Sequence, residues 1–265
     1  MASGFQFPTF LLLDPPAAGA WNMAVDEALL ESAASDGRCT LRFYQWQEPT
    51  LSLGYFQTYA DRWRHEPSRR AAAVRRASGG GAILHDHELT YSFAVPSDHP
   101  LAVDRLGFYR AVHQTLIETL SDWGVAATMF AESSGQPDPR EPGCADRRMD
   151  HCFLCFQRRA PGDVLVGQAK VAGSAQRRCQ GAVLQHGSVL LARSDAAPEL
   201  DGLEELSGRR IAPQSLVEAW LKRLTALVAV FERIDGLSPT QRRRAEQLAV
   251  EKYGHPSWTE RRGRA

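Results

Sequence analysis

The sequence predicts an α+β fold in which a mixed or antiparallel sheet is flanked by helices. Two observations support this class. Short segments of strand character, some of them in hairpins, fill the middle of the chain, and helical patterns occur before, between and after them. The 265 residues, of which 43% are hydrophobic and 23% charged, can also bury a substantial core. We therefore expect a single domain over residues 1–265, with residues 213–253 as C-terminal helices packed on it.

The first half of the chain is predicted to pass from one helix through five strands into a second helix. Trp21–Ala34 has apolar residues at helical spacing, and Asn22 is the expected N-cap. Gly, Pro, Asp and Glu separate the segments of strand character. These strands are predicted at Thr40–Trp46, Thr50–Tyr55, Ala72–Ala77, Ala82–His85 and Thr90–Val95. The second helix is predicted over Leu106–Trp123, where apolar residues recur on one face.

The second half opens with a loop, Glu132–Ala160, that is rich in Gly, Pro, Ser and Arg. A loop of this length within a compact domain is usually functional. Beyond it, the turn Gly167-Gln168 is predicted to join two hairpin strands. The remaining predicted elements are strands at Asp163–Val166, Lys170–Ser174 and Ala182–Leu191, and helices at Pro213–Arg233 and Pro239–Tyr253.

Charge and cysteine content narrow the functional classes. Lys plus Arg and Asp plus Glu both number 31, so the net charge is zero, which argues against a dedicated nucleic-acid-binding protein. The N-terminal stretch has no basic region before its short apolar run, and no apolar stretch reaches the ~20 residues that span a bilayer. Five cysteines, an odd number, favour free thiols. We therefore expect a cytoplasmic protein.

The cationic residues are almost all arginines. Only three of the 31 are lysines, namely Lys170, Lys222 and Lys252. Lys222 and Lys252 fall in the C-terminal helical patterns, where we expect solvated surface residues. Lys170 instead follows the hairpin turn and precedes the small residues Ala172–Ala175, which leave room for a ligand. An ammonium kept at this point of an arginine-rich chain indicates a functional group, and the alternative is a lysine retained by chance.

A glycine-rich loop is the next candidate site. Residues Arg75–Ala82 (RRASGGGA) hold three successive glycines. Such a backbone either turns sharply or lets a ligand approach closely, and its N–H groups could hold a phosphate or a carbonyl. The loop has no GK[ST] sequence and is not a P-loop. The alternative is a plain hairpin turn between neighbouring strands.

Two groups of possible metal ligands are weaker candidates. In the sequence His85-Asp86-His87-Glu88, strand alternation would place both histidines on one face, but no third ligand is evident, so polar pocket lining is the preferred interpretation. Cys144, Cys152 and Cys155, with His151 among them, could bind zinc, but no second CxxC follows at the usual spacing. We predict no metal site, and we keep a zinc-bearing, non-catalytic binding module as an alternative.

Several of these motifs together resemble the lipoate/octanoate transfer family, which includes lipoate–protein ligases, octanoyltransferases and biotin protein ligases. The motifs follow in order along most of the chain, and they are Asn22–Ala24 with Asp26-Glu27, Arg75–Ala82 with His85, Lys170–Gln176, Gln185–Ser188, and Lys252-Tyr253 with Trp258. The resemblance implies the biotin/lipoate protein ligase catalytic-domain fold. It is closest to the cysteine-dependent octanoyltransferases that are related to lipoate–protein ligase A.

The resemblance implies an acyl transfer through a cysteine thioester. In these transferases the nucleophile stands in a Cys-Phe pair fifteen residues before the signature lysine, as Cys155-Phe156 stands before Lys170. The donor would be octanoyl–acyl carrier protein. The acceptor would be a lysine of a lipoyl-carrier domain, such as the glycine cleavage H protein or a 2-oxoacid dehydrogenase E2. The transferase would need no cofactor, would bind neither nucleic acid nor membrane, and would act as a monomer.

The alternative within the family is an ATP-dependent lipoate–protein ligase that uses ATP and Mg²⁺ to form lipoyl-adenylate. Gly81 fits the ligase pattern, because the transferases carry Arg at the third position of the glycine triplet. Cys152-Phe153 also offers a second, weaker candidate nucleophile. In the transferase, Lys170 would either stabilise the Cys155 thiolate as an ammonium or accept the thiol proton as an amine. Backbone N–H groups near Gly79–Gly81 or Lys170-Val171 could hold the oxyanion.

The site predicted from this resemblance therefore has two parts. Cys155 and Lys170 are the expected catalytic residues. The expected acyl- or substrate-binding residues are Arg75, Arg76, Ser78, Gly79, Gly80, Gly81, His85, Gly173, Ser174, Ala175 and His186.

Overall fold

The structure is a computed structural model that describes residues 7–131, 152–228 and 230–263. Cys144 and His151, two of the residues considered for zinc, lie outside the described residues, as does most of the predicted loop Glu132–Ala160. In the described parts of the chain, no helix is both long enough and apolar enough to cross a membrane.

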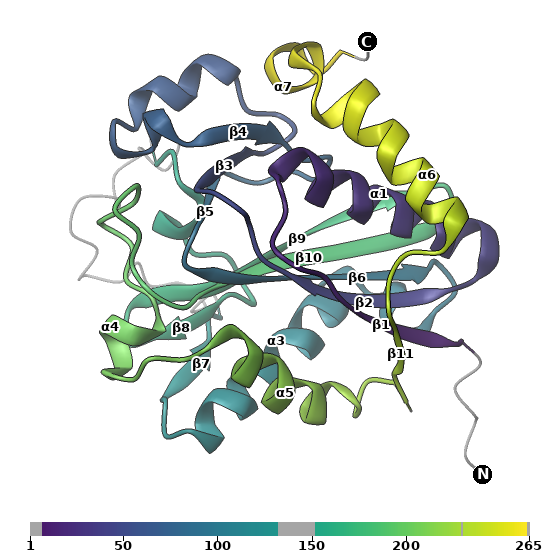
Figure 1. The fold of residues 1–265 in the computed structure, drawn as a ribbon. Coiled ribbons are helices and arrows are strands. Elements are labelled where there is room, and N and C mark those ends of the chain that lie inside the picture. Colours follow the sequence, from purple (N-terminus) through teal and green to yellow (C-terminus); the bar gives the residue numbers. More distant parts are fainter. Residues whose placement is uncertain (1–6, 132–151, 229, 264–265) are drawn as a thin grey trace.

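An eight-stranded mixed sheet runs through the middle of the molecule (Figure 1). In spatial order its strands are β11 (Glu232–Ile234), β1 (Thr9–Leu13), β2 (Cys39–Tyr44), β6 (Glu88–Pro96), β10 (Ala182–Leu190), β9 (Ala169–Cys179), β8 (Val164–Val166) and β7 (Ala127–Met129). The pairs β11–β1 and β1–β2 are parallel, and the other neighbouring strands are antiparallel. The predicted α+β class with a mixed sheet is confirmed.

A second, smaller sheet carries the glycine-rich loop. Its strands are β4 (Ala72–Arg75), β3 (Thr50–Leu53) and β5 (Ile83–His85), in that spatial order. The central strand β3 is parallel to β4 and antiparallel to β5. The glycine-rich loop from β4 to β5 therefore passes across β3, so the alternative of a plain hairpin turn between two paired neighbours does not hold.

Helices cover both faces of the large sheet (Figure 1). Helices α1 (Gly19–Asp36) and α6 (Pro239–Leu248) lie on one face, and α3 (Arg105–Asp122) and α5 (Pro213–Leu224) lie on the other. Side chains alternate across a strand, so Phe93 of β6 packs in the core with α3, whereas its neighbour Ala94 packs in the core with α1. The central strands β6 and β10 are consequently buried along their whole length.

The remaining helical segments are short and lie near the edges of this framework. They are η1 (Tyr59–Arg64), η2 (Pro67–Arg70), α2 (Pro100–Val103), η4 (Cys155–Gln157), α4 (Leu203–Ser207), the π-helical turn η5 (Ala249–Tyr253) and α7 (Pro256–Arg261). The predicted helix Pro239–Tyr253 is thus present as α6 followed by η5. The turn at Gly167 joins β8 to β9 as predicted, with Gly167 at a φ of 58°.

Two predictions about helix ends are wrong. Asn22 lies inside α1, whose N-cap is Ala18, and the Asn22 amide donates to the carbonyls of Ala17 and Gln45. The helix predicted to reach Arg233 ends at Leu224, because Glu232–Ile234 instead pairs with β1 as the edge strand β11. Strands β1, β7 and β11 and helices α2, α4 and α7 were not predicted.

Candidate functional site

Cys155 and Lys170, the two predicted catalytic residues, lie side by side. Cys155 opens η4, Lys170 lies near the start of β9, and Lys170 Nζ is 3.9 Å from Cys155 Sγ. Backbone pairing with the end of the glycine-rich loop fixes the segment that carries Cys155. The Cys155 N–H donates to the Ala82 carbonyl at 2.7 Å, and the Ala82 N–H donates to the Phe153 carbonyl at 3.2 Å.

A buried carboxylate holds the Lys170 ammonium in place. Lys170 Nζ forms an ion pair with Asp163 Oδ2 at 2.7 Å, and the two side chains are only 5% and 1% exposed. Asp163 also accepts hydrogen bonds from the Tyr109 hydroxyl at 2.5 Å and the Ala160 N–H at 2.7 Å. The Phe156 ring lies 5.2 Å from Nζ. The cation beside Cys155 is therefore shielded from solvent and tied to one position, where it can stabilise negative charge on sulfur.

Gly173 provides the space that Lys170 occupies. A Cβ at residue 173 would lie 2.5 Å from Lys170 Cε and 2.8 Å from Nζ. The small-residue run was expected to leave room for a ligand, but at Gly173 that room is filled by the Lys170 side chain. The next residue, Ser174, faces the α3 side, where its Oγ lies 2.7 Å from the Tyr91 hydroxyl.

We expect Gly173→Ala to displace the Lys170 ammonium and to lower the alkylation rate of Cys155 by about tenfold at pH 7, because the added methyl group and the lysine would share one space. Iodoacetamide labelling, quantified on the peptide that carries Cys155, measures this rate. Gly236→Ala is the matched control, since its added Cβ would meet only Arg242 Nη2, at 3.8 Å. Equal alkylation rates in the two variants would contradict the assignment of this space to Lys170.

A buried histidine on α3 supports the same cluster. His113 Nδ1 lies 2.7 Å from the Gly162 carbonyl, and Nε2 lies 2.7 Å from Ser174 Oγ. A carbonyl only accepts, so Nδ1 carries the proton and Nε2 accepts the hydrogen bond of Ser174. Burial lowers the pKa of His113 from 6.5 to about 4. The neutral imidazole therefore anchors the residue immediately before Asp163.

This pKa predicts how stability depends on pH. A histidine whose pKa is depressed in the folded protein contributes stability that is present above the unfolded pKa of 6.5 and is lost as the pH falls towards 4. His113 should account for a loss of about 3 kcal/mol in the free energy of unfolding across that range. Urea unfolding of the wild type and His113→Gln at pH 7 and pH 4.5 checks this. The variant should lose less stability, whereas parallel curves would contradict the assignment.

The two arginines of the glycine-rich loop bind the protein's own backbone. Arg75 donates to four carbonyls, at distances of 2.7 to 3.1 Å, namely those of Gly54, Tyr55, Gln57 and Thr259. Arg76 donates to the Ser52 carbonyl at 2.8 Å, to that of Gly79 at 2.8 Å and to that of Gly81 at 2.6 Å. Burial lowers the pKa of Arg76 to about 10, so it stays charged near neutrality, and it interacts electrostatically with Cys155.

The glycine-rich loop lies directly against the segment that carries Cys155. A Cβ at Gly81 would lie 3.2 Å from Cys155 Cα and 3.3 Å from its backbone nitrogen, so a larger residue there would require the Cys155 segment to shift by a few tenths of an ångström. Within the described part of the chain, the backbone N–H groups of Ser78, Gly79, Gly80 and Gly81 donate to no recorded acceptor. These donors are available to a carbonyl oxygen or oxyanion.

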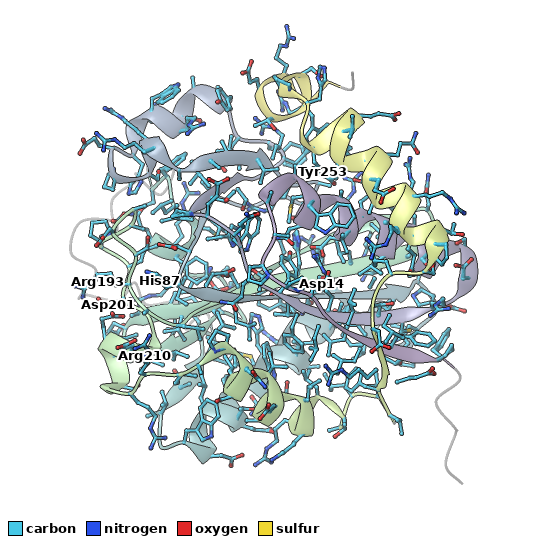
Figure 2. All side chains as sticks on the ribbon, viewed as in Figure 1. Asp14, His87, Arg193, Asp201, Arg210 and Tyr253 are labelled. Carbon is cyan, nitrogen blue, oxygen red and sulfur yellow. The ribbon has the colours of Figure 1, made fainter. Side chains whose placement is uncertain are left out.

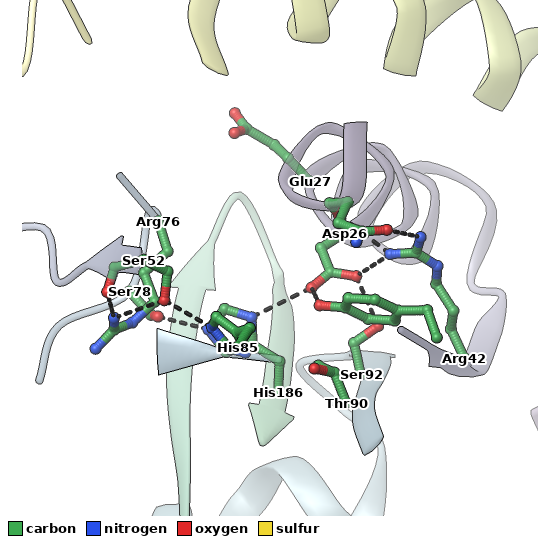
Figure 3. A network of polar contacts seen from close by, with 12 residues as sticks. Asp26, Glu27, Arg42, Ser52, Arg76, Ser78, His85, Thr90, Ser92 and His186 are labelled. Atoms are coloured by element: carbon green, nitrogen blue, oxygen red, sulfur yellow. Dashed lines mark hydrogen bonds and ion pairs between the residues drawn. The ribbon is translucent and has the colours of Figure 1, made fainter. Parts of the chain in front are cut away.

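A second polar chain starts from Ser78 (Figure 3). Ser78 Oγ lies 2.5 Å from His186 Nε2, and His186 Nδ1 lies 3.2 Å from Asp26 Oδ2. Asp26 also accepts hydrogen bonds from Arg42, Tyr44 and Ser92 at 2.8 to 2.9 Å. Burial alone would raise the pKa of Asp26, but the hydrogen bond from His186 and the charge of Arg42 outweigh it and hold the pKa below its ordinary value.

The two histidines of the HxH motif do not share a face, so that expectation is wrong. His85 is buried, stacks on Trp46 with ring centroids 3.9 Å apart, and lies 2.8 Å from Ser52 Oγ through Nε2. Burial lowers the pKa of His85. Figure 2 shows His87 near the edge of the molecule, and its side chain is 61% exposed. No cluster of three potential metal ligands occurs among the described residues.

Two cavities adjoin these groups. The larger, of about 390 Å³, is lined by Ser78 and His186 and by the apolar residues Met23, Leu30 and Leu184. A narrow cavity of about 20 Å³ is lined by four of the predicted binding residues, namely Arg76, His85, Ala175 and His186. Met23 and His186 contribute to both cavities. Cys155 and Lys170 line neither of them.

The expectation that Lys252 is a solvated surface residue is wrong. Lys252 is buried and forms an ion pair with Glu27, and its ammonium lies 4.3 Å from the centre of the Trp258 ring. Lys222 is exposed, as expected. Trp258 in turn donates through Nε1 to the Arg75 carbonyl at 2.9 Å. The C-terminal segment is thereby fastened to the base of the glycine-rich loop.

Sequence reasoning missed three residues of this site. Asp163 was predicted only as the start of a strand. An acid shortly before the lysine motif could have indicated that it is the ion-pair partner of Lys170. Asp26 was noted only as part of a helix motif, and its contact with His186 joins residues 160 positions apart. His113 gave no signal, because one histidine within a helical pattern does not show which face is polar.

The chain is similar to known proteins over most of its length. Residues 18–218 match the model of the lipoyl protein ligase A/B catalytic domain. The chain is 32% identical to octanoyltransferase LipM of Geobacillus kaustophilus over 94% of this chain and 95% of that protein. It is 34% identical to octanoyltransferase LipM of Moorella thermoacetica, over 96% and 98% of the two chains.

Solved structures show the same fold. A bi-partite lipoate protein ligase from Thermoplasma acidophilum superposes with a TM-score of 0.72 at 18% identity, covering 96% of this chain and 97% of the other. A lipoate-protein ligase A bound with ATP gives a TM-score of 0.72 at 20% identity, with 96% and 98% covered.

Proposed function

The chain belongs to the lipoyl protein ligase A/B catalytic domain family, and on that premise we propose that it is an octanoyltransferase. The octanoyl group would pass from an acyl carrier protein to Cys155 and then to a lysine of a lipoyl-carrier domain, such as the glycine cleavage H protein or a 2-oxoacid dehydrogenase E2. The single observation that carries this proposal is the contact of 3.9 Å between Cys155 Sγ and Lys170 Nζ. Relatives named octanoyltransferase, at 32–34% identity over nearly the whole chain, support it.

The first step would be a thioester exchange. The Cys155 thiolate attacks the carbonyl carbon of the donor thioester, the bond from that carbon to the carrier sulfur breaks, and the carrier leaves as a thiol with the proton that Cys155 gave up. Asp163 fixes Lys170 as an ion-paired cation, so Lys170 acts here by stabilising the thiolate rather than by removing a proton. The N–H groups of the glycine-rich loop, which donate to no acceptor among the described residues, would hold the oxyanion.

The second step would form an amide. The neutral amine of the carrier lysine attacks the Cys155 thioester, the carbon–sulfur bond breaks, and the proton that the amine nitrogen gives up passes to the leaving sulfur, which restores the Cys155 thiol. Thioester exchange is nearly balanced in free energy and amide formation is downhill, so this sequence needs no ATP and no cofactor. The octanoyl chain would extend from Cys155 towards the cavity of about 390 Å³, which charged residues also line and where Met23, Leu30 and Leu184 offer apolar contacts. We further propose a cytoplasmic monomer.

An ATP-dependent ligase is the alternative that the assay must exclude. The purified protein is mixed with octanoyl–acyl carrier protein and an unmodified lipoyl domain, without ATP, and the mass of the lipoyl domain is measured. The proposal expects octanoylation of the lipoyl domain under these conditions. Octanoylation or lipoylation that requires free acid, ATP and Mg²⁺, and that persists in Cys155→Ala, would overturn it.

A further inference from the structure

The side chains of Ser78, His186 and Asp26 take no part in the bond changes of the proposed transfer, and they have the arrangement of a nucleophile, a base and an orienting carboxylate. Asp26 is ionised and can only accept, so the proton between it and His186 resides on Nδ1. His186 Nε2 then has its lone pair directed at Ser78 Oγ, 2.5 Å away. The serine proton can therefore move to the imidazole.

The surroundings of Ser78 complete such a site. Ser78 and His186 both line the cavity of about 390 Å³, so an acyl group in that cavity would lie beside both residues. The backbone N–H groups of Ser78 and Gly79 donate to no described acceptor and lie next to the nucleophile, where an oxyanion would form. Asp26 also accepts hydrogen bonds from Tyr44 and Ser92, which fix the carboxylate in position.

We propose that this site is a second, serine-dependent acyl hydrolase that cleaves medium-chain acyl esters and thioesters independently of Cys155. Ser78 Oγ attacks the acyl carbonyl, its proton passes to His186 Nε2, and the leaving alcohol or thiol departs with that proton. Water then attacks the acyl-serine with the same imidazole as base. The acyl–oxygen bond breaks, the free acid leaves and the Ser78 hydroxyl is restored. Arg42 also forms an ion pair with Asp26. Asp26 therefore stabilises the His186 imidazolium less than an unpaired carboxylate would, and we expect a modest hydrolase activity.

The test uses the full chain carrying Cys155→Ala, which removes the cysteine that could also accept the acyl group. This protein should release p-nitrophenolate from p-nitrophenyl octanoate, and adding Ser78→Ala should lower the rate by about 10²-fold. Adding His186→Gln should have a comparable effect. Ser194→Ala is the matched control, because Ser194 Oγ instead donates to Asp86 at 2.7 Å, and it should leave hydrolysis unchanged.

A covalent label keeps the proposal testable even if a Ser78 variant fails to fold. An octyl phosphonofluoridate should modify Ser78 in the Cys155→Ala protein, and peptide mass mapping locates the adduct. Hydrolysis that persists without Ser78, or absence of the phosphonyl group from the Ser78 peptide of folded protein, would overturn the proposal. Because Cys155 is absent from every variant, neither result depends on whether the octanoyl transfer itself is correct.

Discussion

Cys155→Ala is expected to lower octanoyl transfer to a lipoyl domain by at least about 10³-fold, because the acyl group then has no sulfur to accept it. The fold should be preserved, since the Cys155 side chain is only half-buried and its backbone pairing with Ala82 does not depend on the thiol. The measurement is the initial rate of octanoylation of the lipoyl domain, with circular dichroism as the check on folding.

Cys152→Ala is the matched control for this prediction. Cys152 also precedes a phenylalanine and lies three residues before Cys155, but it is Cys155 Sγ that lies 3.9 Å from the Lys170 ammonium. We expect Cys152→Ala to retain transfer. A loss in Cys152→Ala together with activity in Cys155→Ala would move the nucleophile to residue 152. Cys39, in contrast, is an inert core residue, because burial raises the pKa of its thiol to about 12.

Replacement of Lys170 should have the second-largest effect. Lys170→Ala removes the cation beside Sγ, and Lys170→Arg puts a longer, planar group into the space above Gly173, where an added Cβ would already lie 2.5 Å from Lys170 Cε. We expect the rate of transfer to fall by about 10²-fold in both variants, because the loss of a single positioned catalytic group typically lowers a rate by about that factor. Lys222→Arg, an exposed lysine with the same change, should keep the wild-type rate. Near-normal turnover of Lys170→Arg would refute the need for an ammonium.

Stability has to be separated from chemistry in this experiment. Removing Lys170 alone leaves the buried carboxylate of Asp163 without its partner, which typically costs about 3–5 kcal/mol. The double variant Asp163→Asn, Lys170→Met removes both charges and should recover much of that stability without recovering transfer. If the double variant recovered both, Lys170 would be a structural residue only.

The parts of the fold that local patterns control were predictable. The apolar residues of Leu106–Trp123 have the spacing of a helix, and Ala182–Leu191 has the apolar content of a buried strand. Both elements lie within one residue of the predicted ends. The edge strand β11 was not predictable in this way, because Glu232–Ile234 is a strand only through its pairing with β1. The local sequence there continues a helical pattern, and the distant partner decides the outcome.

The same distinction applies to the site. The motif spacing indicated Cys155 and Lys170, and the structure brings them together. The roles of neighbouring residues depend on three-dimensional contacts that no spacing reveals. Arg75 was expected to bind substrate, but four backbone carbonyls accept its hydrogen bonds, one of them that of Thr259 in helix α7. Lys252 was expected on the surface, but its ammonium pairs with Glu27 beneath the C-terminal helices.

The covalent intermediate on Cys155 is the central claim, and intact-protein mass spectrometry tests it most directly. The protein is mixed with octanoyl–acyl carrier protein in the absence of ATP and of any lipoyl domain. The account predicts one octanoyl adduct that neutral hydroxylamine releases, that maps to the peptide with Cys155, and that is absent from Cys155→Ala. An unmodified wild-type protein under these conditions, or an adduct that persists in Cys155→Ala, would contradict it.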